Sequence, residues 1–194
     1  MIEITSKKLK QTDELERASK NLPSNLIIQA YTEHSNLYMI YDFDIDFIFV
    51  PYGADKIVTP RDIVFYNQKA TWVNPEIGPG FKICPNLNLD NIDEVALLYM
   101  EKIPKTYEFV DLHIQNYHEK RNFMKVCCLE FLQDTLETLF SYRFEQKSTF
   151  SNLSCGTFAR VSDGWKFYPK FEPYEGDAND MFQKYLRRDC DDTE

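Results

Sequence analysis

Short apolar or alternating runs, each about the length of one β-strand, dominate the chain from Leu26 onward. Clusters of Pro, Gly, Asn and Asp separate these runs, and such residues are typical of turns. The runs expected to be strands are 26–31, 37–41, 45–50, 62–66, 95–100 and 109–114. Many short strands with frequent turns favour a sandwich or a barrel. We therefore predict a mainly β fold built from antiparallel strands.

The segment 123–144 is compatible with two structures. Its apolar residues could form one helical stripe, but residues 138–144 alternate and Gln133-Asp134 can make a turn, so we favour a hairpin. Two further strands are expected at 154–161 and 164–171. Asp163-Gly164 lies between them, and Asp-Gly is a strong signal for a tight hairpin turn.

Two helices are expected near the ends of the chain. Thr12, followed by Asp13 and Glu14, can cap a short helix, and residues 1–25 are predicted to be an N-terminal helical extension. Asp177 can cap a C-terminal helix whose apolar face holds Met181, Phe182, Tyr185 and Leu186. Residues 26–188 form one predicted domain, and 189–194 an acidic disordered tail.

Charge and cysteine content narrow the class of protein. The 194 residues carry 22 Lys and Arg against 31 Asp and Glu, a formal net charge of −9 that disfavours nucleic acid and anionic membrane partners. The N-terminus lacks a secretory signal, and no apolar run is long enough to span a membrane. Five cysteines without zinc spacing fit reduced thiols. We expect a cytoplasmic protein and leave its oligomeric state open.

Three carboxylates, Asp42, Asp44 and Asp46, alternate with apolar residues where a strand is expected to begin. Side chains two residues apart on a strand share one face, and a hard cation would relieve the repulsion between them. Asp90, Asp93 and Glu94 form a second acidic segment before another strand. Solvated carboxylates at strand ends are the alternative. An EF-hand is excluded, because numbering from Asp42 puts Phe47 where Gly is required.

Signals for catalysis are weak. His34, His113 and His118 are scattered, and the chain has neither a Gly-x-Ser-x-Gly elbow nor a Gly-rich phosphate loop. An enzyme with paired carboxylates would need a cleft and a carboxylate of perturbed pKa, which a sequence does not reveal. We predict that the protein is not an enzyme.

Taken in order, several segments between Asp42 and Leu186 resemble the tellurium-resistance TerD family of bacterial stress proteins. Phe43-Asp44-Ile45-Asp46 is similar to that family's Phe-Asp-Leu-Asp signature, and residues 62–67 are similar to its Asp-Phe-x-Phe-Tyr-Asn strand. Residues 90–94 resemble its Gly-Asp-Asp-Glu segment. Ile103-Pro104, Asn122-Phe123 and residues 164–167 match further landmarks.

The resemblance implies a two-sheet antiparallel β-sandwich that binds Ca²⁺ and has no enzymatic activity. By position, it implies the ligands Asp44, Asp46, Asp93 and Glu94, with Asp42, Asp62, Asn67 and Asp90 as further candidates. We accordingly expect a calcium-binding stress-response protein that acts as an interaction module, with other proteins of a stress-response complex as partners.

Two departures from the family pattern support an alternative. Phe47 stands where the family has small residues, and Asn74-Pro75-Glu76 replaces its Gly-Asp-Asn loop, so an expected Asp is missing. The alternative is a metal-free scaffold for the proteins of a stress or phage-defence complex.

Overall fold

A computed structural model of the chain describes residues 2–5, 20–34, 45–56, 58–65, 70–71, 81–83, 94–116 and 124–186. The N-terminal half contains β1 (Ile2–Thr5), β2 (Lys20–Leu22), β3 (Asn25–His34), β4 (Ile45–Tyr52), the 3₁₀ turn η1 (Pro60–Asp62), β5 (Ala70–Thr71) and β6 (Phe81–Ile83). Next come β7 (Glu94–Tyr99), the 3₁₀ turn η2 (Met100–Lys102), β8 (Phe109–Asn116) and β9 (Met124–Leu132). The chain then forms β10 (Thr138–Phe150), β11 (Asn152–Val161), β12 (Gly164–Tyr174) and helix α2 (Ala178–Leu186).

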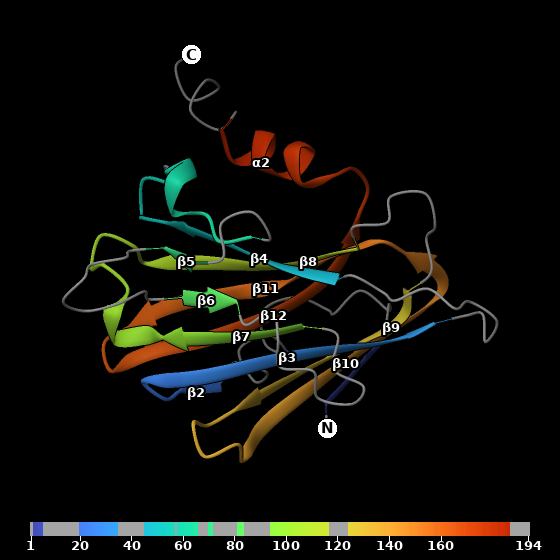
Figure 1. The fold of residues 1–194 in the computed structure, drawn as a ribbon, viewed down its shortest axis with the longest axis horizontal. Coiled ribbons are helices and arrows are strands. Elements are labelled where there is room, and N and C mark those ends of the chain that lie inside the picture. The colour runs from blue at the N-terminus through green and yellow to red at the C-terminus, as the bar shows by residue number, and fades with distance from the viewer. Residues whose placement is uncertain are drawn as a thin grey trace.

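The strands form two sheets, as predicted for a β-sandwich. One sheet has seven strands in the order β1-β10-β9-β3-β7-β6-β5, and the other has five in the order β2-β12-β11-β8-β4. Figure 1 shows helix α2 at one side of the molecule, beyond β4 and β8. All named strand pairs are antiparallel except β1 with β10, which run parallel. In the described part of the chain, no helix is long and apolar enough to cross a membrane.

The N-terminal residues contribute an edge strand to each sheet. β1 aligns Ile2 with Tyr142 of β10, and β2 aligns Leu22 with Trp165 of β12. The predicted N-terminal helix falls mostly on residues 6–19, which lie outside the described residues. The predicted acidic tail at 189–194 also lies outside them.

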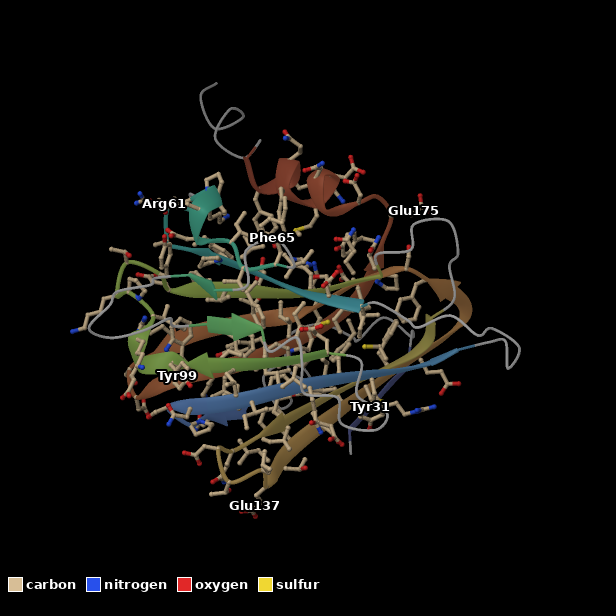
Figure 2. All side chains as sticks on the ribbon, viewed as in Figure 1. Tyr31, Arg61, Phe65, Tyr99, Glu137 and Glu175 are labelled. Carbon is tan, nitrogen blue, oxygen red and sulfur yellow. The ribbon has the colours of Figure 1, made fainter. Side chains whose placement is uncertain are left out.

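Aromatic and branched side chains fill the space between the sheets. Successive side chains of a strand point to opposite faces of the sheet, so every second residue can face this core. Phe47 and Phe49 of β4 and Leu112 of β8 do so. Phe131 packs at ring-centroid distances of 4.8 Å from Phe167 and 6.3 Å from Phe158, so the rings cross from one sheet to the other. Figure 2 shows side chains throughout this layer.

A second, smaller core lies on the outer face of the five-stranded sheet. Ile48 and Val50 of β4 occupy the alternate positions of that strand and pack with Met181 and Tyr185 of α2. Phe65, labelled in Figure 2, meets Phe182 edge to face at a centroid distance of 5.4 Å. Burial of both faces explains why every residue from Ile45 to Pro51 is buried.

Several strand predictions are confirmed. The hairpin in 123–144 is formed by β9 and β10, and the Asp-Gly hairpin by β11 and β12, where Val161 is aligned with Gly164. The prediction of a strand at 62–66 is wrong for its described residues, 62–65. Asp62 ends η1, and Val64 and Phe65 are bridge residues that belong to no named strand, with Val64 joined to Phe49. Pro60 fixes the turn that precedes them. The strand expected at 37–41 lies outside the described residues.

Candidate functional site

The structure describes only three of the eight predicted calcium ligands. Asp42, Asp44, Asn67, Asp90 and Asp93 lie outside the described residues. Asp46, Asp62 and Glu94 lie within them, on β4, at the end of η1 and at the start of β7.

These three carboxylates do not form a shared site by themselves. Asp46 lies on the outer face of its strand and is 8% exposed. Asp62 accepts a hydrogen bond from the Tyr107 hydroxyl, and its Oδ1 is 4.0 Å from Arg61 Nε. Among the described residues, no group of three or more His, Cys, Asp or Glu side chains could hold a metal ion. A calcium site built on Asp46 or Glu94 would need ligands from the segments that precede β4 and β7.

A cavity of about 530 Å³ lies between α2 and the outer face of the five-stranded sheet, and it is partly open to solvent. Its walls come from β4, β8, β11, β12 and α2, so residues far apart in sequence meet there. Its volume falls in the range of small-molecule sites, about 300–1,000 Å³. The cavity is therefore a candidate binding site within the described part of the molecule.

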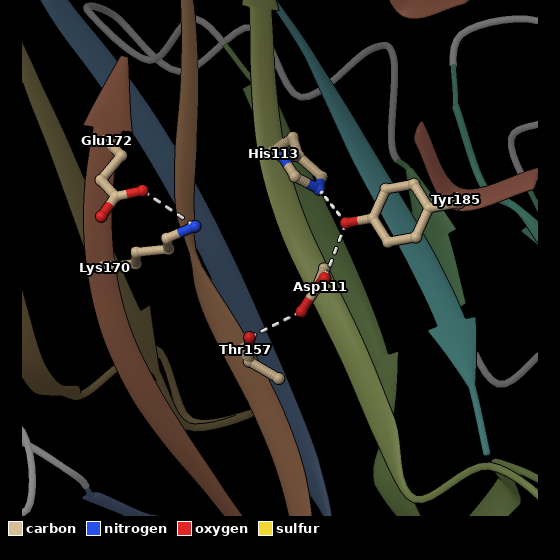
Figure 3. A network of polar contacts seen from close by, with 6 residues as sticks. All are labelled: Asp111, His113, Thr157, Lys170, Glu172 and Tyr185. Atoms are coloured by element: carbon tan, nitrogen blue, oxygen red, sulfur yellow. Dashed lines mark hydrogen bonds and ion pairs between the residues drawn. The ribbon is translucent and has the colours of Figure 1, made fainter. Parts of the chain in front are cut away.

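Asp111 is the centre of a hydrogen-bond network in this cavity (Figure 3). Its Oδ1 accepts from the hydroxyls of Thr157 at 2.6 Å and Tyr52 at 3.1 Å. Its Oδ2 accepts from the Tyr185 hydroxyl at 2.6 Å, and His113 Nε2 lies 2.7 Å from the same hydroxyl oxygen. Three hydroxyl donors thus satisfy this carboxylate and connect α2 to β4, β8 and β11.

The network defines the protonation state of His113. Tyr185 has one hydroxyl proton, which it donates to Asp111, so His113 Nε2 must carry a proton and donate it to the Tyr185 oxygen. Burial lowers the pKa of His113 to about 4; Asp111 opposes this shift, and Lys170 and Lys184 add to it. At neutral pH the ring is therefore uncharged, and Nδ1 has an unprotonated lone pair.

Two lysines line the same cavity. Lys170 Nζ is paired with Glu172 at 2.9 Å, and both side chains are more than half exposed. Lys184 Nζ lies 5.6 Å from the centre of the Tyr174 ring. The cavity thus combines a buried neutral histidine with ammonium groups closer to solvent.

A bulge in β11 helps to build the cavity wall. Ser154 is aligned with His113 and Gly156 with Leu112, so β11 has one extra residue at this point. The extra residue lets Ser154 and Thr157 face the same side although they are three residues apart. Gly156 has φ of +154°, and an added Cβ would lie 2.7 Å from Phe167 Cζ.

Helix α2 is capped as predicted. Asp180 N–H donates to Asp177 Oδ1 at 2.9 Å, and Asp177 N–H donates to Asp180 Oδ2 at 3.0 Å. This reciprocal pair satisfies two amides at the helix start. Asn152 Nδ2 also donates to the Gly176 carbonyl at 2.6 Å, which ties the approach to the helix to β11.

Sequence reasoning missed Asp111, His113 and Tyr185 as a group. Asp111, His113 and Gln115 alternate along β8 and share its outer face, a pattern visible in the sequence. Their meeting with Tyr185 depends on where α2 docks, which no local pattern specifies. Trp165 is a core aromatic, with Arg160 4.4 Å from its ring centre.

The architecture places the chain among two-sheet β-sandwich proteins. Neither a family model nor a curated protein sequence matches it. Solved structures do match. The crystal structure of SAV2460, a protein of unknown function, is similar with a TM-score of 0.60 and 14% identity, over 84% of this chain and 95% of that one.

A second solved structure is also similar in fold. It is a homologue of the telluride resistance protein TerD, SCO6318 from Streptomyces coelicolor A3(2). The TM-score is 0.58 and the identity 10%, over 81% of this chain and 94% of that one. The chain therefore has a TerD-like fold, in agreement with the resemblance of its sequence motifs.

Proposed function

We propose that the protein is a tellurite-resistance-like stress-response protein, working in the cytoplasm as a non-enzymatic module that binds other proteins. The observation that carries this proposal is the fold, which is similar to a TerD homologue over 81% of this chain. No nucleic acid or membrane partner is proposed, because the net charge of −9 repels both phosphate backbones and anionic lipids.

Calcium is part of this proposal. Asp46 supports it, because a carboxylate only 8% exposed at the start of β4 gains from a nearby cation. Glu94 supports it too, since it begins β7 and directly follows the acidic segment that includes Asp90 and Asp93. Ion binding at this end of the strands would order a recognition surface for a protein partner.

Thermal unfolding in EDTA and then in millimolar calcium or magnesium tests the ion. At a hundredfold excess over Kd, binding to the native state adds about 2.7 kcal/mol, or roughly 5–10 °C for a domain of this size. We expect this rise with calcium in the wild-type protein and its loss in the Asp44→Asn, Asp46→Asn double variant. A matched control is Asp134→Asn, Glu137→Gln, which changes two exposed carboxylates in the β9–β10 turn. An equal rise in both double variants, or none in the wild type, would refute the calcium site.

The metal-free scaffold remains the second candidate. The hydrogen bond from Tyr107 to Asp62 favours it, because this carboxylate already has a protein donor. Mutations at the acidic segments would then leave partner binding unchanged. Co-purification of partners with the wild type and with the Asp44→Asn, Asp46→Asn variant, each in EDTA, separates the two candidates.

A further inference from the structure

Two side chains that line the cavity under α2, His113 and Tyr174, carry buried polar atoms that lack partners within the described residues. His113 is 6% exposed, and its Nδ1 accepts no hydrogen bond there. The Tyr174 hydroxyl, whose ring meets the His113 ring edge to face at 5.8 Å, likewise has no partner in the described chain. Buried polar atoms without partners are costly, so a bound molecule that supplies those partners is stabilised.

The hydrogen-bond chain fixes what His113 can accept. Because Nε2 donates to Tyr185, Nδ1 is an acceptor and is directed away from Tyr185. Asp111 could accept a hydrogen bond from a ligand only by weakening one that it already has, since three protein hydroxyls donate to it. At the inner wall, His113 Nδ1 therefore lacks an O–H or N–H group that would donate a hydrogen bond to it.

The lysines define the complementary charge. Lys184 contacts the Tyr174 ring and has no carboxylate within ion-pair distance among the described residues. Lys170 forms an ion pair with Glu172, and both side chains are more than half exposed. Such an exposed pair contributes little to stability. Both ammonium groups lie near enough to His113 to act on its charge. An anionic group is thus favoured at the outer part of the cavity.

We propose that this cavity binds a small organic anion that carries an O–H or N–H donor. The donor bonds to His113 Nδ1, and the carboxylate or phosphate pairs with Lys184. The body of the molecule packs against the apolar parts of Tyr52, Tyr174 and Met181. Of the proposed calcium ligands, the three within the described residues, Asp46, Asp62 and Glu94, are not among the residues that line this cavity.

The test is a titration of the full chain, in EDTA, with a panel of named probes. The panel contains hydroxycarboxylates such as 4-hydroxybenzoate, amino acids, and nucleoside monophosphates such as AMP. The neutral counterparts 4-hydroxybenzamide and adenosine, and inorganic phosphate, are included. Binding is followed by calorimetry and by the ¹⁵N resonances of the His113 ring. Carboxylate and phosphate probes are compared directly, which identifies the anionic group.

We expect at least one organic anion to bind saturably and to shift the Nδ1 resonance of His113. Its neutral counterpart, and the Lys184→Met variant, should each weaken binding by about tenfold or more. The control Lys166→Met removes a lysine of β12 that does not line the cavity and should bind as the wild type does. Failure of the whole panel would overturn the proposal. So would affinity unchanged by Lys184→Met, or inorganic phosphate binding as tightly as every organic anion.

Discussion

His113 combines burial, a fixed tautomer and nearby charges in one residue. Burial lowers its pKa to about 4; Asp111 raises it, whereas Lys170 and Lys184 lower it further. The Tyr185 hydroxyl oxygen accepts a hydrogen bond from Nε2–H, and the Tyr174 ring packs against the imidazole ring. Any proton added to the ring would be buried, and two ammonium groups nearby would oppose its charge.

This environment makes stability depend on pH. The unfolded chain protonates His113 near pH 6.5, whereas the folded chain does so only near 4, so the unfolded state binds more protons between these values. The free energy of unfolding should fall by about 3 kcal/mol from this residue alone as the pH drops from 6.5 to 4. Urea unfolding at several pH values measures the fall.

The His113→Leu variant isolates this contribution from those of the carboxylates, which also titrate in acid. Its stability should decline less steeply between pH 6.5 and 4 than that of the wild type. Parallel stability curves for the two proteins would contradict the assignment of a neutral buried His113.

At the scale of elements, the bulge in β11 determines how the cavity wall is built. Gly156 has φ of +154°, and a Cβ there would overlap the Tyr168 carbonyl oxygen and lie 2.7 Å from Phe167 Cζ. We expect Gly156→Ala to destabilise the fold by about 3 kcal/mol or more, because both backbone conformation and space oppose it.

Gly164 provides the matched control for this prediction. Its φ is +135°, but an added Cβ meets nothing within 4 Å, so Gly164→Ala carries only the backbone strain. Chemical denaturation of both variants gives the comparison. Equal losses at the two glycines would show that close contact at the bulge does not matter.

Elements with strong local signals could be predicted from the sequence. Asp163-Gly164 specifies a hairpin because the turn itself favours it, and Asp177 specifies a helix start because its side chain caps the helix. Residues 62–66 misled, since Ile63 and Phe65 pack in the outer core and Val64 in the inner one, as on a strand, although no named strand forms in their described part. The register shift at Gly156 and the docking of α2 depend on tertiary contacts, so the cavity was not predictable.

For the whole molecule, β1 and β2 cover one edge of each sheet. They pair with β10 and β12, whose backbone groups would otherwise be open to another chain. Deleting residues 1–22 should therefore cause self-association, measured by sedimentation velocity. Deleting residues 187–194 removes no strand of the described sheets and serves as the control. A monomeric protein lacking residues 1–22 would contradict this view of the edges.

The same pairing joins strands that are far apart in the sequence. Ile2 is aligned with Tyr142, and Leu22 with Trp165, so each edge strand waits for a partner about 140 residues further along the chain. Contacts so distant in sequence slow folding, because a long loop must close before they form. Until those partners are synthesised, the nascent chain carries two unpaired strands, and chaperone contact at these strands would matter most during that period.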